Sequence, residues 1–266
     1  MHYYDQHMHT YFSPDSVEKF ENYLEQSDKA LVTTEHLDFF SPYQNQADVI
    51  PDFPRYTAKI EQLNKEYDNR VRKGIEVGFT YPDKDKIQDY LSGKDFDLIL
   101  LSVHHNGQYN FMNIGNEDVP LTEHLNDYYS RMLQAVQEFP NANVLAHFDY
   151  GLRGYTVTVD ELRQVEKKLL KVFKTAVQNE LAFELNTKSM YRHGNAHLYE
   201  YAIDLYLSAG GKMFTLGSDA HKAEDYEFHF KEAAEMLKRH GVEQLVTFQQ
   251  QEPSFVPIPQ EKVTTK

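Results

Sequence analysis

The chain has 266 residues, of which 41% are hydrophobic, and its 27 Lys and Arg against 41 Asp and Glu leave a formal net charge of −14. This length is enough to bury a large core, and the acidic balance argues against general binding to a nucleic-acid backbone. The absence of cysteine excludes disulfides, thiolate metal sites and a cysteine nucleophile, so any metal site must use nitrogen and oxygen ligands.

Apolar runs rich in Val, Ile, Leu and aromatic residues alternate along the chain with longer segments of helical period. This alternation predicts βα units and a mainly parallel sheet. The predicted strands cover residues 3–7, 30–34, 71–76, 96–103, 143–147, 182–186, 212–217 and 244–248. The predicted helices cover residues 17–27, 54–67, 84–91, 121–139, 159–178, 198–208 and 223–239.

Seven βα units favour a closed or nearly closed, TIM-barrel-like α/β fold, with an open doubly wound sheet as the alternative. We expect a single domain over residues 1–266, with about the last ten residues forming a flexible tail. Two longer irregular segments, residues 39–53 and 106–119, each follow a predicted strand. Because active sites of barrels are built from the loops after the strands, these segments are candidate lids or substrate walls, with surface loops that have no role as the alternative.

Histidine and acidic residues recur where the predicted strands end. They are His7-Met8-His9, Glu35-His36, Glu76, His104-His105, His147-Phe148-Asp149, Glu184-Leu185-Asn186 and Asp219-Ala220-His221. Each fragment alone is more often an ordinary interior or surface feature than a set of ligands. In a parallel barrel, however, all these strand ends lie on one face, and imidazole and carboxylate are the ligands of divalent cations. The joint pattern therefore predicts a metal-dependent hydrolase.

The spacing within these fragments supports shared sites. Residues two apart on a strand point to the same side, so His7 and His9 can reach one cation. Asp15 follows in a turn that can fold a carboxylate back over the strand end. Asp219 and His221 have the same spacing, although Asp219 has a second interpretation as the N-cap of the predicted helix 223–239.

Taken together, the motifs resemble the polymerase and histidinol phosphatase (PHP) superfamily, and within it the histidinol-phosphatases. The likeness covers nearly the whole chain and includes the segment Thr34-Glu35-His36-Leu37-Asp38-Phe39. It implies a distorted (β/α)7 barrel with the metal site at the carboxyl ends of the strands. It also implies up to three divalent metal ions, for which zinc, iron and manganese all accept this ligand chemistry.

The resemblance implies a ligand set for each cation. The first takes His7, His9, Glu76 and Asp219; the second shares Glu76 and takes His104 and His147; the third takes Asp15, His36 and His221. Many members of the superfamily have histidine at the position of Asp15, whereas the histidinol-phosphatase-like members have aspartate. The three carboxylates offset only half of six positive charges, which leaves about three to hold a phosphate dianion.

The implied activity is the hydrolysis of L-histidinol phosphate to L-histidinol and inorganic phosphate in histidine biosynthesis. We expect direct attack on phosphorus by a water or hydroxide held between metals. Arg153 and Arg192 are the candidates for clamping the phosphate. His105 and His193 are the candidates for protonating the leaving alkoxide or contacting the substrate.

Glu35, Asp149 and Glu184 have two possible roles, either meeting a cationic group of the substrate or orienting metal-bound imidazoles. A phosphoesterase acting on a nucleotide, a phosphodiester or another small ester is the alternative function, and a metal-binding module without turnover is the non-enzymatic one. We expect a small phosphate ester as partner and neither nucleic acid nor membrane. The N-terminus lacks a basic segment followed by an apolar one, which predicts a cytoplasmic location.

Overall fold

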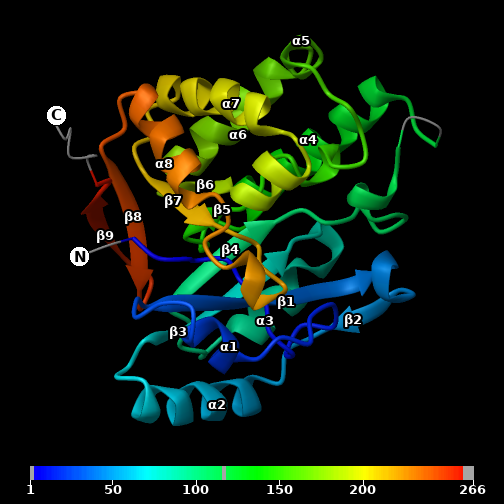
Figure 1. Ribbon diagram of the computed structural model, residues 1–266. Coiled ribbons are helices and arrows are strands. Elements are labelled where there is room, and N and C mark those ends of the chain that lie inside the picture. Colours follow the sequence, from blue (N-terminus) through cyan, green and yellow to red (C-terminus); the bar gives the residue numbers. More distant parts are fainter. Residues whose placement is uncertain (1–2, 116–117, 260–266) are drawn as a thin grey trace, which may run out of the picture.

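A seven-stranded sheet forms the centre of the computed structural model, which describes residues 3–115 and 118–259 (Figure 1). The outermost strand β2 pairs antiparallel with β1, and the remaining neighbours pair parallel. In sheet order the strands are β2 (Ala47–Val49), β1 (Leu31–Ser41), β3 (Val71–Gly78), β4 (Leu98–Ser102), β5 (Val144–Leu145), β6 (Ala182–Asn186) and β7 (Phe214–Gly217).

Residues 5–9 close this sheet into a ring. On one side Thr34 of β1 donates its N–H to the carbonyl of Met8, at 2.7 Å, and on the other His9 donates to the carbonyl of Ala220, at 2.8 Å. The predicted strand at residues 3–7 is therefore irregular, and its ladder contact is a parallel bridge between Met8 and Ala220. With this segment between β7 and β1, the predicted distorted (β/α)7 barrel is confirmed and the open doubly wound alternative is wrong.

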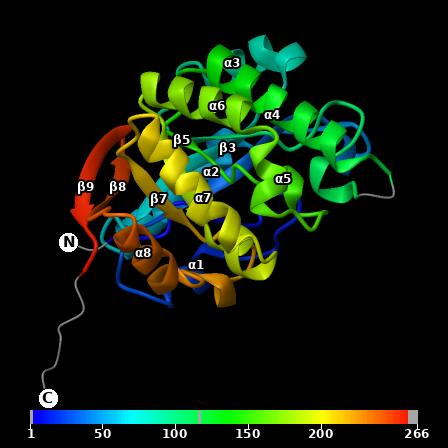
Figure 2. The ribbon, with the colours of Figure 1, turned by 90° about the horizontal axis from the view of Figure 1, so that it is seen from above.

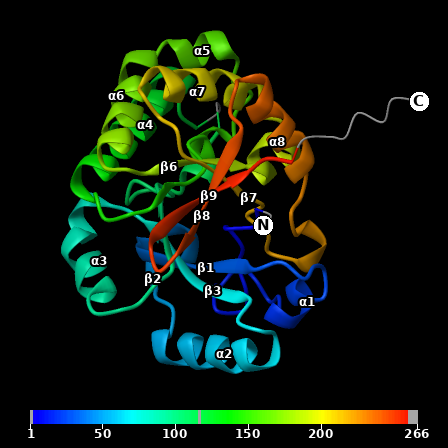
Figure 3. The same ribbon diagram turned by 90° about the vertical axis from the view of Figure 1, so that its left-hand side faces the viewer.

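The helices surround the ring, as the view along the barrel shows (Figure 3). They are α1 (Phe20–Leu24), α2 (Phe53–Glu66), α3 (Lys84–Leu91), α4 (Leu121–Glu138), α5 (Val159–Arg163), α6 (Glu166–Gln178), α7 (Ala196–Ser208) and α8 (Phe230–Arg239). Seen from above, α4, α6 and α7 lie over the strands (Figure 2). Among the described residues, no helix is long and apolar enough to cross a membrane.

Several predicted boundaries were wrong. The single helix predicted at 159–178 is divided into α5 and α6, because Val165 leaves the helical conformation with φ −110° and ψ 10°. The helix predicted at 223–239 begins only at Phe230, after His229 adopts a left-handed φ of 52°. Asp219 therefore lies too far from α8 to cap it, and that interpretation is wrong.

The segment predicted as irregular at 39–53 contains regular structure. Strand β1 continues to Ser41, a short 3-10 helix covers Pro42–Gln44, and β2 returns antiparallel. The register shifts between Asp38 and Ser41, where Phe40 adopts a positive φ of 51°. This bulge turns the β1–β2 hairpin over the carboxyl end of the barrel.

A second hairpin, β8 (Gln244–Gln249) and β9 (Glu252–Pro257), covers the amino end of the barrel (Figure 3). Val246 and Phe248 of β8 join an apolar cluster with barrel residues such as Val32 and Leu100. Strand β9 was not predicted, because prolines at both of its ends hide the strand pattern. The division into a single domain stays a prediction, and most of the expected flexible tail, residues 260–266, lies outside the described residues.

Gln6 joins the closing segment to this hairpin. Its buried amide donates from Nε2 to the carbonyl of Val246 and accepts the N–H of Phe248, both at 2.9 Å. We expect Gln6→Leu to lower the free energy of unfolding by about 2–4 kcal/mol, because two buried backbone groups lose their partners. Urea unfolding measures this change, and Gln249→Leu on the exposed side of β8 is the matched control. Equal stability of the two variants would contradict the role given to Gln6.

Candidate metal centre

The carboxylate of Glu76 lies at the centre of a cluster of imidazoles inside the barrel. Glu76 belongs to β3 and is 1% exposed, and its register partner on β1 is His36. Its Oε2 lies 3.0 Å from His36 Nδ1, 3.4 Å from His7 Nε2 and 3.5 Å from His9 Nε2, and its Oε1 lies 3.1 Å from His104 Nε2 and 2.7 Å from His147 Nε2. Although burial opposes ionisation, the facing imidazoles hold the pKa of Glu76 well below its usual value.

Five buried atoms of this cluster lack a hydrogen-bond partner among the described residues. They are His7 Nε2, His9 Nε2, His36 Nδ1, His147 Nδ1 and Glu76 Oε2. Buried polar atoms are nearly always satisfied, so a group of unsatisfied ones calls for a ligand that the structure does not contain. The ligand atoms of His7, His9 and Glu76 all lie within 4.8 Å of one another. These residues therefore fit a divalent cation bound through nitrogen and oxygen.

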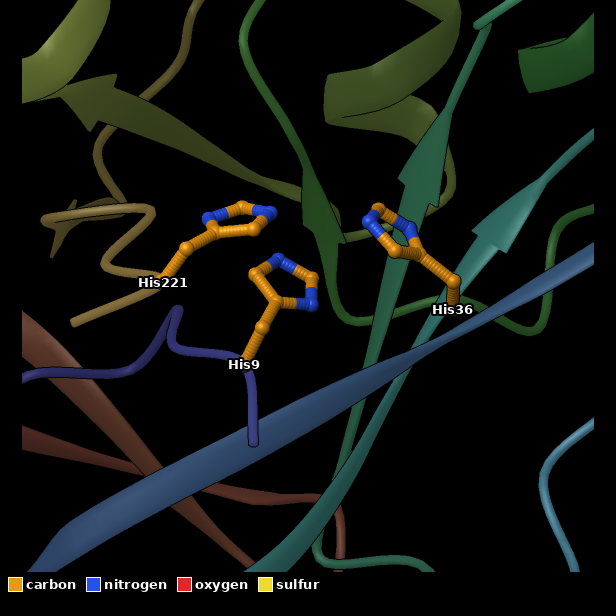
Figure 4. Close-up of side chains that lie close together, drawn as sticks. All are labelled: His9, His36 and His221. Carbon is orange, nitrogen blue, oxygen red and sulfur yellow. The ribbon is translucent and has the colours of Figure 1, made fainter. Parts of the chain in front are cut away.

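A second group of ligands lies at the outer edge of the cluster. Asp15 Oδ2 lies 3.3 Å from His36 Nε2 and 3.1 Å from His221 Nε2. The rings of His9 and His36 stack with centroids 4.2 Å apart, and His221 approaches His9 to 4.4 Å (Figure 4). Three imidazoles this close repel one another when protonated, whereas a bound cation would use their neutral forms.

Two carboxylates orient the imidazoles from behind. Glu184 Oε1 accepts from His7 Nδ1 at 2.6 Å, and Asp38 Oδ1 accepts from His104 Nδ1 at 2.9 Å. A proton held on Nδ1 leaves the lone pair of Nε2 directed at the interior, which is the tautomer a metal requires. Asp38 was missed in the sequence, although its place two residues after His36 on a strand was a readable signal.

Asp219 follows β7 and has a positive φ of 52°. Its carboxylate forms ion pairs with two cationic side chains. Arg153 Nη2 lies 3.0 Å from Asp219 Oδ2, and Lys188 Nζ lies 3.3 Å from Oδ1. Burial opposes ionisation of this carboxyl, yet Lys188 and Arg153 hold its pKa well below the usual value. Lys188 was also missed, because a lysine just after a strand has no distinctive pattern.

The two arginines proposed to clamp phosphate differ in position. The side chain of Arg153 is 2% exposed, and besides Asp219 it donates to Ser189 Oγ at 2.8 Å and to Asn186 Oδ1 at 3.1 Å. Arg192 is about half exposed and forms an ion pair with Asp225. The structure thus brings Arg153 to the candidate metal ligand Asp219 but places Arg192 against Asp225.

The two histidines predicted to act on the substrate also differ. His105 is buried, its Nδ1 accepts the N–H of Gly107, and its Nε2 has no partner among the described residues. His193 is exposed. Burial lowers the pKa of both imidazoles. Their roles stay predictions.

Glu35 and Asp149 are both engaged inside the protein. Glu35 accepts from the hydroxyls of Thr10 and Ser13 at 2.6 and 2.5 Å. Asp149 accepts from Tyr199 Oη and Asn195 Nδ2, both at 2.7 Å. These contacts support a structural role more than the predicted contact with substrate, which stays a prediction.

A pocket opens beside the ligands at the carboxyl end of the barrel. It is lined by Pro14, Asp15, His36, Asp38, Ser41, Gln44, Val49, His104, Asn110, Met112 and Tyr150. Two of its walls come from the segments 39–53 and 106–119, which the sequence singled out as candidate substrate walls. The pocket therefore leads from solvent to the candidate metal ligands between these two segments.

Replacing Glu184 tests the orientation of His7. Glu184→Gln keeps an acceptor near Nδ1 but removes the charge that strengthens the bond. We expect metal affinity to fall about tenfold to a hundredfold, as for other partners of ligating imidazoles. Competition with a chromophoric chelator measures the affinity, and Glu180→Gln, an exposed change near the same strand, is the control. Unchanged metal affinity in Glu184→Gln would show that Glu184 does not support metal binding.

Metal binding should depend on pH. In the metal-free protein, burial by itself lowers the pKa of His104, but Asp38 and Glu76 outweigh it and raise the pKa to about 9. A cation needs the neutral imidazole, so binding must release this proton below pH 9. We expect affinity to rise with pH up to about 9 and calorimetric heats to differ between buffers of different ionisation enthalpy. Buffer-independent heats at pH 7 would contradict this account.

Comparisons with known proteins agree with the geometry. The histidinol-phosphatase of Lactococcus lactis is 27% identical over 255 residues, which cover 92% of this chain and 93% of that protein. A probable histidinol-phosphatase of Thermotoga maritima is 29% identical over 91% of this chain and 94% of its own length. The crystal structure of histidinol phosphate phosphatase from Lactococcus lactis, complexed with zinc, L-histidinol and phosphate, matches with a TM-score of 0.83 and 25% identity over 94% of this chain and 98% of that one. A family model described as the PHP domain matches residues 5–188, more than half of the chain, and the chain therefore belongs to the PHP domain family.

Proposed function

We propose that this protein is a metal-dependent phosphomonoesterase that hydrolyses L-histidinol phosphate to L-histidinol and inorganic phosphate, a step of histidine biosynthesis. The observation that carries this proposal is the cluster of unsatisfied imidazole nitrogens around Glu76 beside an open pocket. Relatives named histidinol-phosphatase align over more than nine-tenths of this chain, which supports the same substrate.

The proposed cofactors are up to three divalent cations, with zinc, iron and manganese all compatible with nitrogen and oxygen ligands. When bound, such cations lower the pKa of a coordinated water and offset charge on the phosphoryl oxygens. We assign His7, His9, Glu76 and Asp219 to one cation, Glu76, His104 and His147 to a second, and Asp15, His36 and His221 to a third.

The chain's own residues would bind the phosphate beside these cations. Arg153 carries a buried guanidinium next to Asp219, where it adds positive charge in a region of low dielectric. Arg192 can reach a phosphate only by leaving its ion pair with Asp225. His105 and His193 are the candidate proton donors to the leaving alkoxide, although burial lowers the pKa of each imidazole and so disfavours its protonated form near neutral pH.

A substrate panel with and without metal tests the proposal. We expect kcat/KM for L-histidinol phosphate to exceed that for p-nitrophenyl phosphate by about a hundredfold or more. Contacts with the histidinol part of the substrate would stabilise its transition state by about 3 kcal/mol, and p-nitrophenyl phosphate cannot make them. Exhaustive chelation should abolish phosphate release, and added zinc or manganese should restore it. Activity untouched by chelation would refute the metal mechanism, and equal rates on both esters would refute the substrate.

A further inference from the structure

Asn110 presents an unpartnered amide nitrogen in the pocket. The residue is 6% exposed, and its Oδ1 accepts the N–H of Met112 at 2.9 Å and the hydroxyl of Tyr150 at 3.1 Å. Because the Met112 N–H can only donate, it fixes which side of the amide is oxygen. Nδ2 has no hydrogen-bond partner among the described residues, although Asn110 lines the pocket.

The backbone ties Asn110 to a metal ligand. Asn110 forms an antiparallel bridge with His105, and Phe111 donates its N–H to the carbonyl of His104 at 2.8 Å. The ring of Tyr150 lies 4.8 Å from the ring of His104. These contacts fix the position of the amide relative to the cations that would bind the phosphate. A substrate bound by the amide at one end and by the cations at the other would be oriented along the pocket.

The chemistry of the pocket restricts what the amide can recognise. An amide NH2 only donates, so it pairs with an acceptor and not with an ammonium group. L-Histidinol offers such an acceptor on its neutral imidazole, in the nitrogen that carries no proton. The apolar side chains of Pro14, Val49 and Met112 also line the pocket and suit the faces of a small aromatic ring.

We propose that Asn110 is a specificity-determining residue, whose Nδ2 donates a hydrogen bond to the unprotonated ring nitrogen of the substrate's imidazole. This inference rests on the proposed function and names the group by which the same site distinguishes its substrate from other phosphate esters. The backbone N–H of Met112 and the hydroxyl of Tyr150 fix the orientation of this amide.

The test compares two esters that differ in the ring. L-Phenylalaninol phosphate has the same amino-alcohol phosphate as L-histidinol phosphate but carries a benzene ring without an acceptor. For Asn110→Leu we expect the ratio of kcat/KM between the imidazole and benzene esters to fall about tenfold to a hundredfold relative to the unaltered protein. Gln108→Leu, which removes an exposed amide from the same segment, should leave the ratio unchanged. An equal fall for both esters in Asn110→Leu would mean that the residue only supports the loop, and would overturn the inference.

A binding measurement on the unaltered, metal-loaded protein removes the risk that Asn110→Leu misfolds. Calorimetry gives the affinities for L-histidinol and L-phenylalaninol between pH 5.5 and 8, and their ratio cancels effects common to both ligands. We expect the preference for L-histidinol to fall about tenfold at the acidic end, because an imidazolium has no acceptor. A preference independent of pH would overturn the inference. Loss of phosphatase activity on every ester, with this pH dependence intact, would refute the proposed function and leave Asn110 as a ligand-binding residue.

Discussion

A carboxylate buried inside a barrel is the constraint on which the rest of the structure depends. Glu76 is 1% exposed and lies among imidazoles from the closing segment and from the strands or strand ends of β1, β4 and β5. An isolated charge is far too costly to bury, so this carboxylate requires positive charge around it. Protonated imidazoles supply that charge in the metal-free protein, and divalent cations would supply it in the loaded one. The same electrostatic requirement explains why Glu184 and Asp38 lie beside His7 and His104, since each imidazole is then placed between two carboxylates.

The barrel separates this charged layer from an apolar one. Residues such as Val32, Leu100 and Val144 fill the amino end, where the β8–β9 hairpin excludes water. The polar residues fill the carboxyl end, where the β1–β2 hairpin and the segment after β4 leave a pocket. The chain has a net charge of −14, but solvent ions screen the charges on its surface. Buried charges are screened much less, so bound cations at the carboxyl end would still attract a phosphate ester. Substrate choice then falls to the neutral groups of the pocket, among them Asn110.

Much of this arrangement could be predicted from residue patterns. The alternation of apolar runs and helical segments favoured a closed or nearly closed α/β barrel over an open sheet, and α3 has the predicted bounds. The position of each ligand fragment at a strand end predicted that the histidines and carboxylates would meet, because parallel strands share one carboxyl edge. Local conformations were predicted less well. The bulge at Phe40 and the break at Val165 each involve a residue type with no turn preference, and tertiary packing outweighs local propensity there.

The sequence by itself determined the chemistry available to this protein, which is nitrogen and oxygen ligands without thiolates. It also determined that these ligands follow the strands, with the two-residue spacing of His7 and His9 and of Asp219 and His221. The tertiary structure alone decided which partner each group received. Asp38 and Lys188 join the site, Arg192 pairs with Asp225, and Glu35 is held by Thr10 and Ser13, whereas the amide nitrogen of Asn110 has no partner in residues 3–115 and 118–259. Such pairings depend on distances between segments far apart in the chain, which only closure of the barrel establishes.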